Sequence, residues 1–232
     1  MRTKRMVGYI LASLGLLVGT PVMYAIAASS SDLISTKVAA MEPLSEVVSL
    51  AKVPKTTDPS WLQHQKATKT VTYVVETSGV ITASITEFKT LANETLNDSR
   101  GWAAMGVRFE EVPSGGMFTL VLSQASLVPS FSSICDASYS CTVGNSVIIN
   151  QDRWLNASAP WNQAGKSLRD YRNLVVNHET GHWLGHTDTN SCSGVGQPAP
   201  VMAQQSLYAS SCVFNPWPLA SELWSTRLGI SL

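Results

Sequence analysis

Three of the four histidines in this 232-residue chain fall within one short stretch, His178 to His186. His178 and His182 are four residues apart, so on a helix both imidazoles lie on one face, about one turn apart. Two nitrogens placed in this way can bind one tetrahedral Zn2+ ion. Glu179 follows the first histidine directly, so it points beside the metal, where a base for a metal-activated water must lie. The motif therefore predicts a zinc site able to hydrolyse a bond.

The residues that follow His182 offer two candidates for a third metal ligand. Gly185 can adopt the left-handed conformation that ends a helix and turns the chain back toward the metal. Asp188 lies at the third-ligand position of the pattern H-E-x-x-H-x-x-G-x-x-[H/D], and we expect it to bind. His186 lies two residues short of that position, but imidazole is the commoner zinc ligand, so it remains the alternative. Three protein ligands leave one position open for water, whereas structural zinc sites are closed by four.

The metal motif requires a helix, and the preceding sequence predicts one. Ser167 and Asp170 form a capping-type start, and apolar residues then recur at helical spacing on the stripe that carries His178 and His182. An earlier helix is predicted from Ile85 to about residue 98.

Strands are predicted where β-branched and aromatic residues cluster, at residues 70–76, 107–112, 118–122 and 146–150. Glycines and prolines make the sequence after Gly185 irregular. This order of elements indicates an α+β domain with a small mixed sheet and two main helices over residues 69–232.

The N-terminal segment is typical of export. Three positive charges lie among the first five residues, residues 6–28 carry none, and residues 25–27 have the small side chains that signal peptidase requires. Residues 1–27 are therefore expected to be a signal peptide, with an uncleaved membrane anchor as the alternative. Both interpretations predict a secreted or cell-envelope protein. Residues 28–68 are expected to be a stalk, a linker or a short pro-segment.

The four cysteines agree with export, because an even set in an exported chain favours two disulfides. Nearness in sequence favours Cys135–Cys141 and Cys192–Cys212, although other pairings are open.

The composition and the absence of other motifs argue against several classes of function. Sixteen basic and sixteen acidic residues give no net charge, which argues against a nucleic-acid partner. The chain has neither the G-x-S-x-G motif of serine hydrolases nor a glycine-rich phosphate loop. We expect a monomer that meets a membrane only through the N-terminal segment.

The zinc motif resembles that of the metzincin branch of the zincin metallopeptidases. Metzincins place a methionine turn (Met-turn) beneath the metal, and Met202 fits this position, after Pro200 and downstream of Asp188. The stretches 171–179, 199–205 and 212–218 also resemble an uncharacterised secreted domain family of actinobacteria that is described as zincin-like. This resemblance covers about residues 70–220. Its members usually have histidine where this chain has Asp188, although acidic third ligands occur elsewhere among metzincins.

The resemblance implies a zincin-like fold and a secreted zinc endopeptidase that acts on peptides or proteins. Glu179 would take a proton from a zinc-activated water and deliver it to the leaving amine. Tyr208 is a candidate for stabilising the oxyanion. An edge strand that binds substrate through its backbone is expected at residues 117–123 or within 128–145. Two alternatives remain open: a non-catalytic, zinc-containing binding module of the cell envelope, and a zinc amidase acting on cell-wall peptide.

Overall fold

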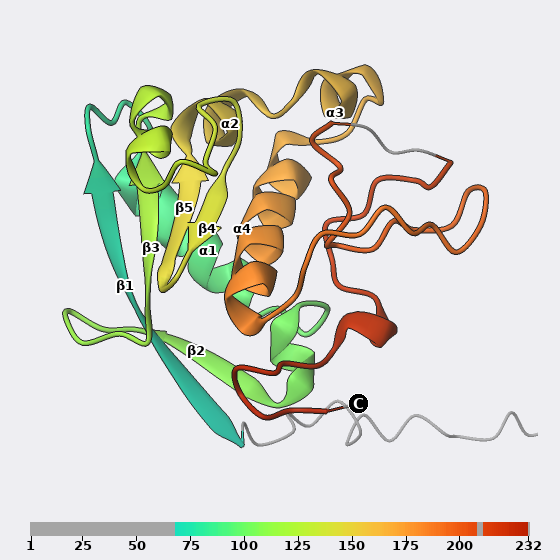
Figure 1. The fold of residues 1–232 in the computed structure, drawn as a ribbon, viewed down its shortest axis with the longest axis horizontal. Coiled ribbons are helices and arrows are strands. Elements are labelled where there is room, and N and C mark those ends of the chain that lie inside the picture. The colour runs from blue at the N-terminus through green and yellow to red at the C-terminus, as the bar shows by residue number, and fades with distance from the viewer. Residues whose placement is uncertain (1–67, 208–210, 232) are drawn as a thin grey trace, which may run out of the picture. The chain divides into compact units, whose positions relative to one another are not determined.

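The computed structural model describes residues 68–207 and 211–231 (Figure 1). The predicted signal peptide, residues 28–67 of the predicted linker, and Tyr208 lie outside the described residues. Among the described helices, none is both long enough and apolar enough to cross a membrane.

A five-stranded mixed sheet forms the centre of the domain. Its strands are β1 (Lys69–Ser78), β2 (Val107–Glu111), β3 (Phe118–Ser123), β4 (Cys141–Val143) and β5 (Ser146–Asn150). Their order across the sheet is β2-β1-β3-β5-β4, and every neighbouring pair is parallel except β4 with β5. The four predicted strands are present. The additional strand, β4, is antiparallel and lies at the edge of the sheet.

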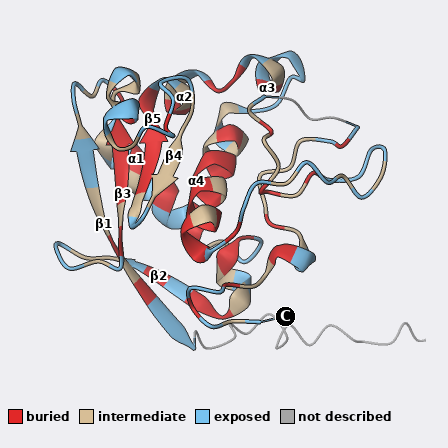
Figure 2. Ribbon diagram, in the orientation of Figure 1, coloured by how far each residue is buried: buried red, intermediate tan, exposed pale blue. Residues whose placement is uncertain are grey.

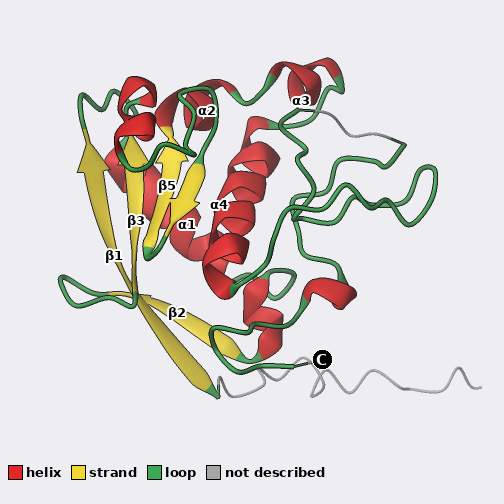
Figure 3. Cartoon of the chain, viewed as in Figure 1, coloured by secondary structure: helices red, strands yellow, loops and turns green. Residues whose placement is uncertain are grey.

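Two helices dominate the rest of the domain, so the prediction of an α+β fold with two main helices is confirmed at this level (Figure 3). The α-helices are α1 (Ile85–Leu96), α2 (Gln151–Asn156), α3 (Ala159–Gln163) and α4 (Leu168–Leu184). Short 3-10 helices are η2 (Trp102–Met105), η3 (Ala125–Ser130) and η4 (Ala220–Glu222). Helix α4 packs against α1 and against the β5–β4 side of the sheet. The chain after α4 runs mainly as loops, as its glycines and prolines predict.

The alternation of side chains along the central strands divides the core between the two faces of the sheet. Leu120 and Leu122 of β3 belong to the large cluster that includes α1 and α4. Val121, between them, faces a smaller cluster that includes Val128 of η3 and Cys135. Figure 2 shows that the burial continues along α4, so the metal motif is carried by a helix fixed in the core.

The ends of α4 form from local signals. Ser167 Oγ accepts the N–H of Asp170 at the start of the helix, and Gly185 ends it with a φ of 108°. At α1, Ser84 Oγ likewise accepts the N–H of Glu87. The Glu87 carboxylate does not complete a capping box, however, because it binds the guanidinium of Arg172 on α4 at 2.6 Å.

Two disulfides join the pairs that nearness in sequence favoured, Cys135–Cys141 and Cys192–Cys212. The first ties the edge strand β4 to the loop before it. The second joins two loops after α4. Both are compatible with an extracytoplasmic protein.

Candidate metal centre and cleft

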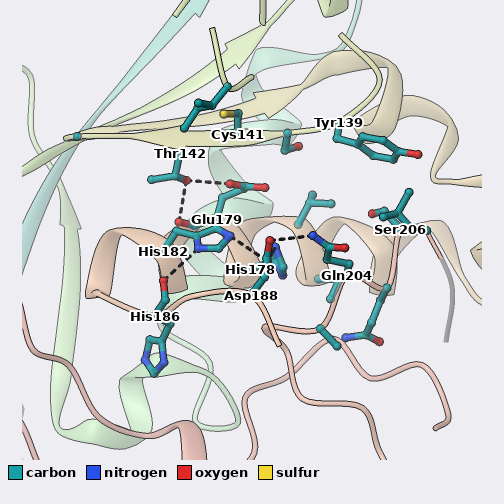
Figure 4. Close-up of a pocket in the computed structure, with 18 of the residues that line it drawn as sticks. Tyr139, Cys141, Thr142, His178, Glu179, His182, His186, Asp188, Gln204 and Ser206 are labelled. Atoms are coloured by element: carbon teal, nitrogen blue, oxygen red, sulfur yellow. Dashed lines mark hydrogen bonds and ion pairs between the residues drawn. The ribbon is translucent and has the colours of Figure 1, made fainter. Parts of the chain in front are cut away.

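Helix α4 and the turn after it bring three possible metal ligands together. His178 and His182 lie one turn apart on the helix, and the chain reverses at Gly185 so that Asp188 faces both imidazoles (Figure 4). Asp188 Oδ1 lies 3.2 Å from His178 Nε2 and 3.3 Å from His182 Nε2. Among the described residues, these three side chains form a group whose ligand atoms lie within 4.8 Å of one another.

The other ring nitrogen of each histidine is held by a backbone carbonyl. His178 Nδ1 lies 2.9 Å from the oxygen of Val201, and His182 Nδ1 lies 3.1 Å from the oxygen of His186. A carbonyl oxygen only accepts, so each Nδ1 carries the hydrogen, and in a neutral ring the Nε2 lone pair points at Asp188. With both rings neutral, two imidazole nitrogens and a carboxylate oxygen face one another with no proton between them. This donor set fits a divalent cation such as zinc. When a ring is protonated, its Nε2–H donates to Asp188 Oδ1 instead.

His186 does not fit the role of third ligand in this geometry. Its ring is buried, and its Nε2 donates a hydrogen bond of 2.9 Å to the oxygen of Trp224. Its centroid lies 5.0 Å from that of Trp102 and 3.9 Å from that of Trp224. Figure 4 shows the ring pointing away from the other two histidines. The structure therefore places the Asp188 carboxylate, and not the His186 ring, beside the imidazoles of His178 and His182.

Glu179 lies beside the three candidate ligands and is only 5 % exposed. The hydroxyl of Thr142, on the edge strand β4, lies 2.8 Å from Glu179 Oε2 and 2.9 Å from the Glu179 backbone oxygen. Burial raises the pKa of Glu179, although His178, His182 and the Thr142 hydrogen bond oppose the shift. A buried carboxylate with a raised pKa, next to possible metal ligands, has the properties of a general base.

Asp188 is held as an anion. The hydrogen bonds from His178 and then His182 keep the pKa of Asp188 well below its usual value. The side-chain amide of Gln204 donates to its other oxygen, Oδ2, at 2.9 Å. Burial lowers the pKa of His178, but the Asp188 hydrogen bond, the negative charge of Glu179 and the Val201 carbonyl outweigh burial and raise it above 6.5.

These pKa shifts predict how the metal-free protein responds to pH. Because His178 has a raised folded-state pKa, its stabilising contribution is complete below about pH 6.5 and is lost as the pH rises through that pKa. The raised pKa of Glu179 likewise makes the folded protein less stable as the pH rises. The lowered pKa of His186 changes the stability only below about pH 6.5, so it does not affect this range. We expect the chelator-treated protein to lose stability as the pH rises from about 6.5 through the folded-state pKa of His178, by up to about 1.4 kcal/mol per pH unit for each proton lost.

Urea denaturation with a chelator over this pH range measures the slope. A His178→Gln variant should show a weaker slope. With zinc the slope should reverse, because the ligands must lose their protons to bind metal. Equal slopes in the chelated wild type and the variant would contradict the assignment.

Met202 lies beneath α4 and packs against Gly181. In the sequence, Gly181 lies between the two candidate histidine ligands. Met202 is 2 % exposed. A Cβ atom at Gly181 would overlap Met202 Sδ and would lie 3.0 Å from Cζ2 of Trp102. Glycine therefore permits the close approach of the methionine to the helix backbone, and a larger residue would have to displace Met202.

We expect Gly181→Ala to destabilise the protein by about 1–3 kcal/mol, because the added methyl group overpacks a closed site. Chemical denaturation of the metal-free protein measures this change. Gly194→Ala is the matched control, since its nearest neighbour would be Gln197 Cγ at 3.5 Å, an ordinary contact. Equal stabilities of the two variants would show that Met202 moves aside at little cost.

An open cleft of about 540 Å³ runs over the three candidate ligands. Its lining includes Thr142 and Gly144 on the β4 side, the ligand face of α4, and residues 203–207. Figure 4 shows the β4 hairpin on one side of the ligands and Gln204 and Ser206 on the other. The expectation of an edge strand at residues 117–123 is wrong, because β3 is hydrogen-bonded between β1 and β5. The edge strand that borders the cleft is β4, within residues 128–145.

Sequence patterns did not identify three residues that contact this site. Thr142 lies on a strand too short for a pattern, and Glu222, which binds the Met202 turn, is far from the motif in sequence. Gln204 could have been suspected from its place two residues after Met202.

Fold and site together define a mixed α+β domain with a His–His–Asp cluster beneath an open cleft. Residues 49–220 match the model of a protein family described as "Protein of unknown function (DUF3152)". The match covers most of the chain, so the protein belongs to this family. This result agrees with the sequence resemblance to an uncharacterised domain family. A comparison with curated proteins found no match.

Proposed function

We propose that this domain is an exported zinc-dependent endopeptidase. One observation carries the proposal. The Nε2 atoms of His178 and His182 and Oδ1 of Asp188 converge at a cleft, with the buried Glu179 beside them. A site built only to bind metal would not need this extra carboxylate. Three N/O ligands also differ from a structural zinc site, which is closed by four ligands and usually rich in cysteine.

His178, His182 and Asp188 would hold the zinc ion. When bound, zinc supplies Lewis acidity, which makes water more acidic and polarises a carbonyl oxygen. Glu179 accepts a proton as the water oxygen adds to the peptide carbonyl carbon. It returns this proton to the nitrogen as the C–N bond breaks, so that a carboxylic acid and an amine leave. Thr142 limits the orientations of Glu179 through its hydrogen bond.

The position of β4 supports a peptide as the substrate. A strand at the edge of a sheet presents unpaired backbone groups, and an extended peptide can add to it as a further strand. Because Thr142 belongs to this strand and also contacts Glu179, a peptide paired with β4 would run beside the general base. The two disulfides fit a site of action outside the cytoplasm.

Cleavage of a peptide library tests this proposal. The chain without residues 1–27 is loaded with zinc and incubated with the library, and products are identified by mass spectrometry. Cleavage that a chelator abolishes and zinc restores would support the proposal. A folded, zinc-loaded protein that leaves the library intact would overturn a general endopeptidase. Release of peptide from cell-wall material by that protein would then favour an amidase.

A further inference from the structure

The C-terminal segment Leu219–Ile230 lies mostly beyond the residues that match the family model and packs beneath the candidate metal centre. The segment contains one buried carboxylate, that of Glu222, which is 8 % exposed. Glu222 Oε2 accepts the N–H of Val201 at 2.9 Å, and Oε1 accepts the N–H of Met202 at 3.0 Å. The carboxylate therefore fixes two consecutive peptide groups of the turn beneath α4.

This turn leads directly to the first histidine ligand. The N–H of Val201 is bound to Glu222, and the carbonyl oxygen of the same residue accepts a hydrogen bond from His178 Nδ1. A movement of Val201 would therefore change both the tilt of the His178 ring and the direction of its Nε2 lone pair.

A second arm of the same segment leads to the other histidine ligand. The carbonyl oxygen of Trp224 accepts a hydrogen bond from His186 Nε2, and the carbonyl oxygen of His186 accepts one from His182 Nδ1. The Trp102 and Trp224 rings pack against His186. The backbone oxygen of His186 thus holds the His182 ring, and the His186 side chain is itself held by the C-terminal segment.

The segment also holds the end of α4. Ser225 Oγ donates to the carbonyl oxygen of Leu184 at 2.8 Å, and Arg227 Nε donates to that of Trp183. Such carbonyls in the last turn have no partner within a helix. The helix end between His182 and Asp188 is therefore tied to the same segment as the two histidine rings.

We infer that Leu219–Ile230 positions both histidine ligands for metal binding, with Glu222 and His186 as positioning residues. This inference rests on the metal site of the proposed function, but not on its peptidase activity. Hydrogen-bonded partners behind a metal ligand fix the tautomer and the ring orientation, and their loss typically weakens metal binding about 10–100-fold. The Glu222 carboxylate and the His186 ring do not contact the ligand rings. They hold the backbone groups that do, so the lower end of this range is expected.

Glu222→Gln tests the first arm. The variant keeps the size of the side chain, but its amide nitrogen cannot accept a backbone N–H, so one of the two peptide groups loses its partner. We expect zinc to bind about 10-fold more weakly, measured by competition with a chelating dye. The absorption spectrum of the Co2+ form should also change, because the ligand geometry changes.

Val128→Ala is the control for a general loss of stability. Val128 is buried in the smaller core cluster, on the opposite face of the sheet from α4. This variant should unfold more easily than the wild type, yet bind zinc and give the Co2+ spectrum as the wild type does.

His186→Phe tests the second arm and keeps the test open if Glu222→Gln does not fold. Phenylalanine preserves the packing against the two tryptophans but cannot donate to the Trp224 carbonyl. We expect weaker zinc binding and a changed Co2+ spectrum here too. Wild-type affinity and spectrum in the folded variants would overturn the inference, as would an equal loss in Val128→Ala at equal stability. A wild-type protein that binds no zinc would refute the metal site itself and, with it, the proposed function.

Discussion

Glu179→Gln is expected to reduce zinc-dependent peptide hydrolysis by about 10²–10⁴-fold, the contribution typical of a general base. This loss corresponds to about 3–5 kcal/mol of transition-state stabilisation. Glutamine has the same shape, and its carbonyl oxygen can still accept the Thr142 hydrogen bond, but its amide cannot take a proton from water. The loss should fall on kcat, with little change in KM, because the proton transfer occurs only in the transition state.

Steady-state kinetics on a peptide cleaved by the wild type measures the effect. Glu110→Gln is the matched control, since Glu110 is an exposed residue of β2, the strand at the opposite edge of the sheet from β4. The zinc affinity of Glu179→Gln should stay close to that of the wild type, because Glu179 is not one of the three ligands. Full activity of this variant would remove Glu179 from the mechanism.

Asp188→Ala is expected to weaken zinc binding by at least about 100-fold. A directly coordinating oxygen is lost, so the effect should exceed the range for residues behind the ligands. The variant then keeps two of the three candidate ligand groups, the imidazoles of His178 and His182. The pKa of His178 should also fall, because the Asp188 hydrogen bond raises it. Isothermal titration calorimetry with zinc measures the affinity.

Asp152→Ala provides the matched control, since Asp152 is exposed at the start of α2. His186→Phe should weaken zinc binding less than Asp188→Ala, because its carbonyl stays next to His182 Nδ1. If His186→Phe caused the larger loss, the assignment of Asp188 as the third ligand would fail.

The parts of the structure that follow from local signals could be predicted from sequence. Ser167 and Gly185 mark the two ends of α4, and the spacing of the residues between them places His178 and His182 on one face. The four strands with clear patterns were predicted for the same reason. Asp188 could be proposed because Gly185 ends the helix and turns the chain back, so that only residues just after it can approach the two histidines.

The rest depends on contacts between segments far apart in sequence. The role of the His186 ring could not be predicted, because its direction is set by Trp102 and by the carbonyl of Trp224. The position of β4 at the edge follows from the order of all five strands, which no local pattern encodes. Glu222 has no motif around it, and its function is visible only where its carboxylate meets Val201 and Met202.

The shortness of β4 has a consequence for self-association. An open strand that can pair with a substrate can also pair with the edge of another molecule, and long open edges lead to aggregation. β4 has only three residues, and the Cys135–Cys141 disulfide anchors its first residue. Very short edge strands are one way in which proteins limit edge-to-edge pairing. The length of β4 thus limits sheet growth at the edge beside the cleft.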